Sequence, residues 1–382
     1  MQTAIVNAHI ISPDLDIPGG TILVDGSVIS AVLPPEEPLP EVGKIVDLAG
    51  KMIAPGFIDI HCHGRDGYDF CDGSNEAITQ IARGKLSEGV TSFLGTTLTV
   101  SEEQLTAALQ NAANYMARQH DGAKMPGIHL EGPFINPDCL GAQNPAHASL
   151  PDIGLVNRLN DIYPIRKLSY SIELPGGDEL ARALLAMGIT PSCAHSAAKY
   201  ADFKRLYELG LRDITHFCNV VTPLHHLEFG VVGGGMLHKD VFVELICDGR
   251  HLCPEMIKLL FDVKGCDHII LITDAIRATN MPDGEYDLGG IIATVRDGCA
   301  RTPAGRMAGS TLEYYQGLRR VVDTTGLPLS ELIKTTSWNQ AKSLGLENLG
   351  KIEPGFTADL VVLNKDFSPA AVWVNGLVAK GE

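Results

Sequence analysis

The chain has 382 residues, 45% of them hydrophobic and 20% charged, so it can bury a large core and lacks the composition of a disordered protein. Its formal net charge of −16 argues against nucleic acid or an anionic membrane as partner, because both bind basic surfaces. The nine cysteines form no C-x-x-C pair, which favours a reducing cytoplasm over a disulfide framework. The sequence shows no secretory signal and no apolar run of membrane-spanning length.

The two ends of the chain predict one small β domain. Runs rich in strand-forming residues lie at 4–11, 21–24, 28–33, 359–363 and 371–374. Asp25-Gly26 is a hairpin signal between two of them. Because these runs flank everything else, we expect a small β-sandwich domain made of residues 1–52 and 350–382.

The middle of the chain alternates strands and helices. Strand-like runs occupy 57–63, 90–97, 127–131, 168–173, 190–195, 213–217, 243–248 and 269–274. Helical patterns lie between most of them, at 75–88, 101–119, 178–187, 199–209 and 254–263. Such alternation predicts a parallel sheet. Eight units in roughly 220 residues predict an α/β fold with a (β/α)8 barrel as the catalytic domain, residues 53–349.

Most of the predicted strands end in a side chain capable of metal or proton chemistry. These residues are His61, His63, Glu131, Glu173, His195, His216, Asp248 (with His251 three residues on) and Asp274. In a (β/α)8 barrel the carboxyl ends of all strands meet on one face, and that face holds the active site. Residues far apart in the sequence are therefore expected to share one site.

The histidines suggest metal ligation. His61 and His63 are two apart in a strand, so both imidazoles can approach one ion, although two ordinary loop histidines would give the same pattern. His195 and His216 end consecutive strands, and their matching positions favour ligation over two core histidines. Neutral imidazole suits zinc, iron, nickel or copper.

Two carboxylates complete the pattern. Glu131 lies between an apolar strand and a Gly-Pro pair, where it is either a ligand or a turn residue. Asp274 follows a buried strand and needs a partner to stay ionised; a metal-activated water or backbone amides would serve. Together these residues predict metal-assisted hydrolysis, with a carboxylate carrying the water proton. No serine-hydrolase, dinucleotide or Walker motif is present, and the glycine run 233–235 is interpreted as a turn at a close approach.

Seven segments resemble, in order, those of the N-acetylglucosamine-6-phosphate deacetylase family of the amidohydrolase superfamily. They are 55–64 (Pro-Gly-Phe-Ile-Asp-Ile-His-Cys-His-Gly), 129–134, 195–196, 215–219, 248–251, 273–275 and 308–310. The resemblance covers essentially the full length. It implies a TIM-like barrel with a small β-sandwich built from both termini, a divalent metal cofactor and a homodimer.

The resemblance also implies roles for individual residues. Glu131, His195 and His216 would be the principal metal ligands, His61 and His63 a second metal site that some members retain, and Asp274 the general base and acid. Substrate contacts would come from Ala142, Asn219, Val220 and Met307, and His251 would contact the phosphate. The expected ion is zinc, with iron, manganese, cobalt and nickel as alternatives, and one or two ions per subunit.

The segment after Asn219 departs from the family. Its usual His-His-Arg-Glu-Pro-Gly is His-His-Leu-Glu-Phe-Gly at 225–230, and Val220-Val221 replace the usual Ala-Met. The family's Arg binds the substrate phosphate, whereas Leu227 has neither charge nor donors. Three explanations stay open: another cation replaces the Arg, the phosphate is presented differently, or the substrate has no phosphate. The replacement candidates are Arg250, Arg277 and the pair His225 and His226, of which His226 is taken as a substrate contact.

We therefore expect a metal-dependent hydrolase that removes acetate from an N-acetylated amino sugar, with N-acetylglucosamine 6-phosphate as the first candidate. His195 or His251 would help to stabilise the oxyanion. A deacetylase of an unphosphorylated sugar or another N-acyl amine is an alternative. Cyclic amidases and N-acyl-amino-acid deacylases are disfavoured, because Glu173 stands where they often have a carboxylated lysine. A non-catalytic sugar-binding barrel is disfavoured by Asp274, since binding alone needs no base.

Overall fold

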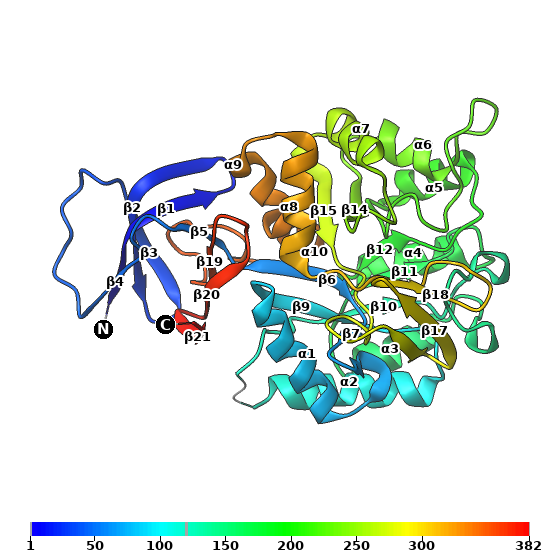
Figure 1. Ribbon diagram of the computed structural model, residues 1–382. Helices are drawn as coiled ribbons and strands as arrows, with labels where there is room; N and C mark the ends of the chain where they lie inside the picture. The colour runs from blue at the N-terminus through cyan, green and yellow to red at the C-terminus, as the bar shows by residue number, and fades with distance from the viewer. Residues whose placement is uncertain (1, 119–120, 382) are drawn as a thin grey trace.

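The computed structural model describes residues 2–118 and 121–381 (Figure 1). Its central feature is a barrel of eight parallel strands that are neighbours in chain order. They are β6 (Phe57–Cys62), β9 (Val90–Thr96), β10 (Ile128–Glu131), β11 (Ile165–Tyr170), β12 (Thr190–Cys193), β13 (Asp213–Ile214), β14 (Phe242–Ile246) and β15 (Ile269–Ile272). A parallel bridge between Cys62 and Ala275 links the last strand to the first. The predicted barrel and its eight strands are confirmed.

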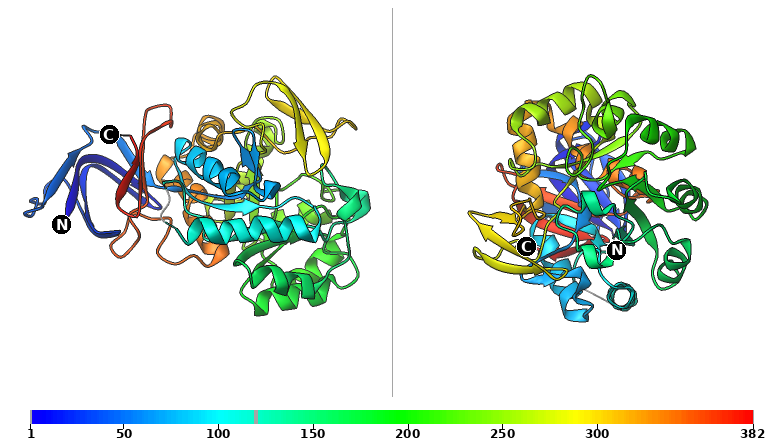
Figure 2. Two further views of the ribbon diagram at one scale, coloured as in Figure 1. Left: turned by 90° about the horizontal axis from the view of Figure 1, so that it is seen from below. Right: turned by 90° about the vertical axis from the view of Figure 1, so that its right-hand side faces the viewer.

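Helices surround these strands (Figure 2). They are α1 (Asn75–Ser87), α2 (Glu102–Met116), α3 (Ile153–Asn160), α4 (Gly177–Ala186), α5 (Tyr200–Leu209), α6 (Gly230–Leu237), α7 (Pro254–Lys264), α8 (Tyr314–Thr325), α9 (Leu329–Leu332) and α10 (Trp338–Leu344). The start of α2 has a local cause: the Ser101 hydroxyl accepts from the Gln104 backbone, and the Gln104 side chain accepts from the Ser101 backbone in return. None of the helices in the described residues is both long and apolar enough to cross a membrane.

The glycine run 233–235 lies inside helix α6, so the predicted turn is wrong. The close approach is present, because a Cβ atom on Gly234 would lie 2.4 Å from the Phe203 ring, and one on Gly235 would lie 2.5 Å from the Phe217 ring. Packing of α6 against these aromatic rings outweighs the low helix propensity of glycine.

A second eight-stranded sheet joins both ends of the chain. It contains β1 (Thr3–Ser12), β2 (Leu15–Asp25), β3 (Val28–Leu33), β4 (Lys44–Asp47), β5 (Met52–Pro55), β19 (Leu360–Leu363), β20 (Pro369–Val374) and β21 (Leu377–Lys380). Strand β5 pairs with β1 on one side and β19 on the other, and the apolar residues of the two ends share one cluster. Figure 1 shows this extra domain at one end of the molecule, with both termini in it.

Two small antiparallel sheets complete the fold. Strands β7 (Gly64–Arg65) and β8 (Tyr68–Asp69) form a hairpin after the first barrel strand. Strands β16 (Gly284–Leu288), β17 (Ile291–Arg296) and β18 (Cys299–Arg301) form a three-stranded sheet between β15 and α8. This insertion has no counterpart in the elements expected from the sequence. It matters for the site, because residues at its ends face the cavity described below.

Candidate active site

A cavity of about 600 Å³ opens at the carboxyl ends of the barrel strands. Its wall includes most of the predicted strand-end residues, namely His63, Glu131, His195, His216, His251 and Asp274. His61 lies beneath them and is fully buried. Two groups of three side chains bring possible metal-ligand atoms together.

The first group consists of Glu131, His195 and His216. Oε1 of Glu131 lies 3.2 Å from Nε2 of His216 and 3.4 Å from Nε2 of His195. The two Nε2 atoms are 3.1 Å apart. Glu131 ends β10, and the two histidines lie two residues beyond the ends of β12 and β13, so the alignment of neighbouring parallel strands brings the three residues together.

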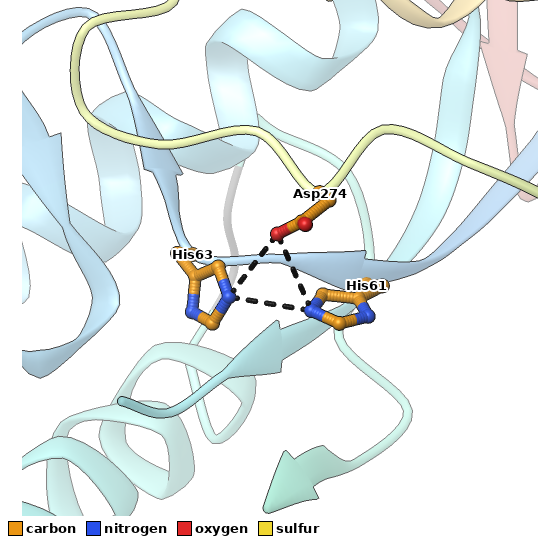
Figure 3. Close-up of side chains that lie close together, drawn as sticks. All are labelled: His61, His63 and Asp274. Carbon is orange, nitrogen blue, oxygen red and sulfur yellow. Dashed lines mark hydrogen bonds and ion pairs between the residues drawn. The ribbon is translucent and has the colours of Figure 1, made fainter. Parts of the chain in front are cut away.

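The second group consists of His61, His63 and Asp274 (Figure 3). The two Nε2 atoms are 3.3 Å apart, and Oδ1 of Asp274 lies 3.4 Å from each of them. Figure 3 shows the three donor atoms facing one another. His61 lies in β6 and His63 directly follows the strand, and both rings lie on one side of the chain, as the H-x-H spacing predicts.

Glu131 lies between the two groups. While Oε1 faces His195 and His216, Oε2 lies 3.3 Å from Nε2 of His63. The side-chain amide nitrogen of Gln143 donates to the same Oε2 at 2.6 Å. The side-chain oxygen of Gln143 accepts from the Thr99 backbone N–H at 2.7 Å. Oε1 also lies 3.6 Å from Nε2 of His61, so the carboxylate is held in an orientation in which it contacts histidines of both groups.

The donor atoms of both groups fit a tetrahedrally bound ion. Ligand distances of about 2.0–2.1 Å place neighbouring ligand atoms about 3.3–3.4 Å apart. The candidate ligand atoms are 3.1–3.4 Å apart in the first group and 3.3–3.4 Å apart in the second, close to the separation expected around one ion. Imidazole and carboxylate ligands are also the set that zinc and other first-row divalent ions accept.

The electrostatics of the cluster favour a bound cation. Burial opposes the ionisation of Glu131, but the facing imidazoles, His61 foremost, hold the pKa of this carboxyl well below its usual range. Burial likewise opposes the ionisation of Asp274, yet His61 and His63 keep its pKa below the ordinary value. Both carboxylates are therefore negatively charged at neutral pH, in a water-poor site where charge interactions are strong.

Three of these residues adopt an uncommon backbone conformation. His195, His216 and Asp274 have φ angles of 47°, 34° and 50°, in the left-handed region that non-glycine residues rarely occupy. Each lies where a barrel strand gives way to its loop. Such conformations are retained where the surroundings impose them, as at functional sites.

Other predicted residues take different places. Ala142, Asn219, Val220, His251 and Met307 line the cavity, whereas His226 is exposed and is not among the lining residues. Glu173 joins neither group, because it accepts hydrogen bonds from Ser196, Ala197 and Asn136 beyond the end of β11. Asp248 supports His251, with Oδ2 2.8 Å from Nδ1 of the ring. The strand ends thus include supporting residues as well as candidate ligands.

Sequence reasoning missed several residues of this site. Gln143, which bonds to Glu131, is one, and Glu244, with Oε2 3.3 Å from Nδ1 of His61, is another. Glu244 lies in the middle of β14, where nothing local distinguishes it from a structural carboxylate. A third is Arg306, which lines the cavity from the segment after β18. Only its position next to Met307 could have drawn attention to it.

Comparison with known proteins identifies the family of the chain. Residues 244–379 match the model of the amidohydrolase family. The N-acetylglucosamine-6-phosphate deacetylase of Lysinibacillus sphaericus is 36% identical over 83% of this chain and 82% of its own length. The N-acetylgalactosamine-6-phosphate deacetylase of Escherichia coli O157:H7 is 33% identical over 94% of this chain and 93% of its own. The crystal structure of N-acetylglucosamine-6-phosphate deacetylase from Thermotoga maritima has a TM-score of 0.90 at 34% identity, covering 99% of this chain and 100% of that one.

The barrel with its extra β domain and the matches to these proteins define the chain as an amidohydrolase, a class of metal-dependent hydrolases. Within that class the chain belongs to the N-acetylglucosamine-6-phosphate deacetylase family.

Proposed function

We propose that this protein hydrolyses the N-acetyl group of an amino-sugar 6-phosphate, with N-acetylglucosamine 6-phosphate as substrate, and releases acetate. The observation that carries the proposal is the pair of ligand groups on either side of Glu131, with Asp274 at the cavity wall. We further propose residues 53–349 as the catalytic domain, a homodimer as the assembly and the cytoplasm as the location; the nine free cysteines support the last.

Metal binding is assigned to the two groups. Glu131, His195 and His216 would hold one divalent ion, and His61, His63 and Asp274 would add a second site. Zinc is our first choice for the ion. When bound, such an ion lowers the pKa of a water and polarises the amide carbonyl.

We assign to Asp274 the transfer of a proton from the attacking water to the leaving nitrogen. Its carboxylate is held ionised by the neighbouring imidazoles, so it can accept a proton from the attacking water. The same carboxyl can then protonate the leaving nitrogen, which becomes the free amine of the product. Its low pKa makes the return of the proton favourable.

His251 is the better of the two candidates for stabilising the oxyanion. His195 has both ring nitrogens occupied, since Nδ1 lies 2.9 Å from the Cys139 carbonyl and Nε2 faces Glu131. Within the described part of the chain the His251 ring is bonded only through Nδ1, to Asp248, and this histidine lines the cavity. Its Nε2 is therefore available to the substrate.

An acetate-release assay tests the proposal. The purified protein, with its metal content measured, is assayed on N-acetylglucosamine 6-phosphate, N-acetylgalactosamine 6-phosphate and both unphosphorylated sugars. We expect the highest kcat/KM for N-acetylglucosamine 6-phosphate. Equal or higher kcat/KM values for the unphosphorylated sugars would refute the proposal that the substrate carries a 6-phosphate.

The galactosamine isomer is a second candidate, favoured by the 33% identical relative that is named for it. The two phosphates differ only in the configuration at one sugar hydroxyl. The same assay separates them, because a higher kcat/KM for N-acetylgalactosamine 6-phosphate would replace our first substrate with the second.

A further inference from the structure

A sugar phosphate needs a cation in this acidic protein, and the family position for it is Leu227, whose side chain is uncharged and 82% exposed. Among the described residues that line the cavity, Arg306 is the only lysine or arginine. The remaining charged groups of the wall are three carboxylates, at Glu131, Asp138 and Asp274, and histidines.

The cations suggested by the sequence are engaged elsewhere. Arg250 donates from Nη2 to the backbone carbonyl of Asp297. Arg277 donates from Nη2 to Asp72 at 2.6 Å. Neither arginine is part of the cavity wall, and the exposed rings of His225 and His226 also lie outside it.

The backbone around Arg306 holds this residue at the wall. The Arg306 carbonyl accepts from the Thr302 backbone at 2.9 Å, and an antiparallel bridge joins Arg301 to Met307. Met307, the next residue along the chain, lines the same cavity. The turn is therefore anchored on both sides, and the side chain that leaves it is directed by a defined backbone.

The guanidinium of Arg306 is free to bind a ligand. It is exposed and makes no hydrogen bond or ion pair within the part of the chain that the structure describes. It lies close enough to the loop 138–143 to act on Cys139: burial and two carboxylates raise the pKa of that thiol, and Arg306 opposes them. Its charge therefore extends over the cavity from the side of the β16–β18 sheet.

We propose that Arg306 binds the 6-phosphate of the substrate and replaces the arginine that the family carries at the position of Leu227. A guanidinium forms two parallel hydrogen bonds to a phosphate, which makes it the natural replacement for an arginine clamp. The cation comes from a turn of the barrel domain, far from position 227 in the sequence. This inference rests on the proposed function, since it requires a phosphorylated substrate.

The test compares Arg306→Gln with a matched control, Arg296→Gln. Arg296 is exposed at the end of β17, in the sheet that precedes the Arg306 turn, and does not line the cavity. For each protein, kcat and KM are measured on N-acetylglucosamine 6-phosphate and on N-acetylglucosamine, and binding of glucosamine 6-phosphate is measured by calorimetry. We expect Arg306→Gln to lower the ratio of the two kcat/KM values about 10- to 100-fold, mainly through KM, and to weaken calorimetric binding similarly. Arg306→Lys should recover part of the loss, and the control should match the wild type.

Each outcome decides one question. If the wild type prefers the phosphate and Arg306→Gln keeps that preference within twofold, the role of Arg306 is refuted while the proposed function stands. An equal loss in the control would also refute it, because the effect would then be one of overall charge. If the wild type has no preference for the phosphate, the phosphorylated substrate itself is refuted, and Arg306 loses its role with it.

Discussion

Oε2 of Glu244, on β14, lies 3.3 Å from Nδ1 of His61, on β6, and both side chains are fully buried in the barrel. Burial by itself would raise the pKa of the Glu244 carboxyl. The neighbouring ammonium of Lys167 and the hydrogen bond with His61 outweigh burial and hold this pKa far below its usual value. A carboxylate on Nδ1 fixes the imidazole so that Nε2 faces His63 and Asp274. Such support behind a ligand histidine tunes metal affinity.

We predict that Glu244→Gln weakens metal binding about 10- to 100-fold, because the amide supports His61 less well than a carboxylate does. A competition titration with a chelator measures the affinity. Asp213→Asn is the matched control: Asp213 is the other carboxylate on Lys167, and it contacts no metal-group histidine. The control should lose stability and keep its affinity, whereas unchanged affinity in Glu244→Gln would remove this role.

For Asp274→Asn we predict a loss of kcat of about 10²–10⁴-fold, because the amide cannot accept the proton of the attacking water. The ion held by Glu131, His195 and His216 should remain, as metal analysis would show. Asp138→Asn, which changes another carboxylate of the same cavity wall, should keep most of the activity. Near-normal turnover in Asp274→Asn would exclude Asp274 as the base.

Removal of the metal should abolish activity and lower the free energy of unfolding. A ligand at 1,000 times its Kd stabilises a protein by about 4 kcal/mol, so treatment with a chelator should lower the melting temperature, and added zinc should restore both properties. Elemental analysis should find two ions in the wild type and one in His63→Ala. Equal metal content in the two proteins would contradict the second site.

The surroundings of Lys264 lead us to predict that the free energy of unfolding depends on pH. Its Nζ donates to the carbonyls of His238 and Lys239, and burial, together with the charge of Lys239, lowers its pKa to about 8. An unfolded lysine titrates near 10.5, so between these values the unfolded state binds more protons and stability increases with pH.

The comparison of wild type with Lys264→Met isolates this effect, because other titrating groups cancel. From pH 7.5 to pH 9.5 the free energy of unfolding of the wild type should gain about 1 kcal/mol relative to the variant. Chemical denaturation at several pH values measures the difference. A difference that does not change with pH would show that Lys264 titrates normally.

The sequence by itself determined the barrel and the composition of the site. Strand and helix periods are local, and parallel strands of one barrel align at their carboxyl ends. The positions of His61, His63, Glu131, His195, His216 and Asp274 at predicted strand ends are therefore enough to group them in one site. The fourth strand shows the limit of this reasoning: β11 ends at Tyr170, so Glu173 lies in the following turn and bonds to neighbouring loops.

Only the tertiary structure decided how these residues are divided and supported. Glu131 stands between two groups because β10 lies between β6 on one side and β12 and β13 on the other, and Glu244 reaches His61 across 183 positions of sequence. Arg306 reaches the cavity from the segment after the inserted sheet, which the Thr302–Arg306 hydrogen bond and the Arg301–Met307 bridge hold in place. Contacts between elements that are distant in the chain depend on packing, which no local pattern encodes. The sequence could therefore show that the family arginine is absent, but not which side chain takes its place.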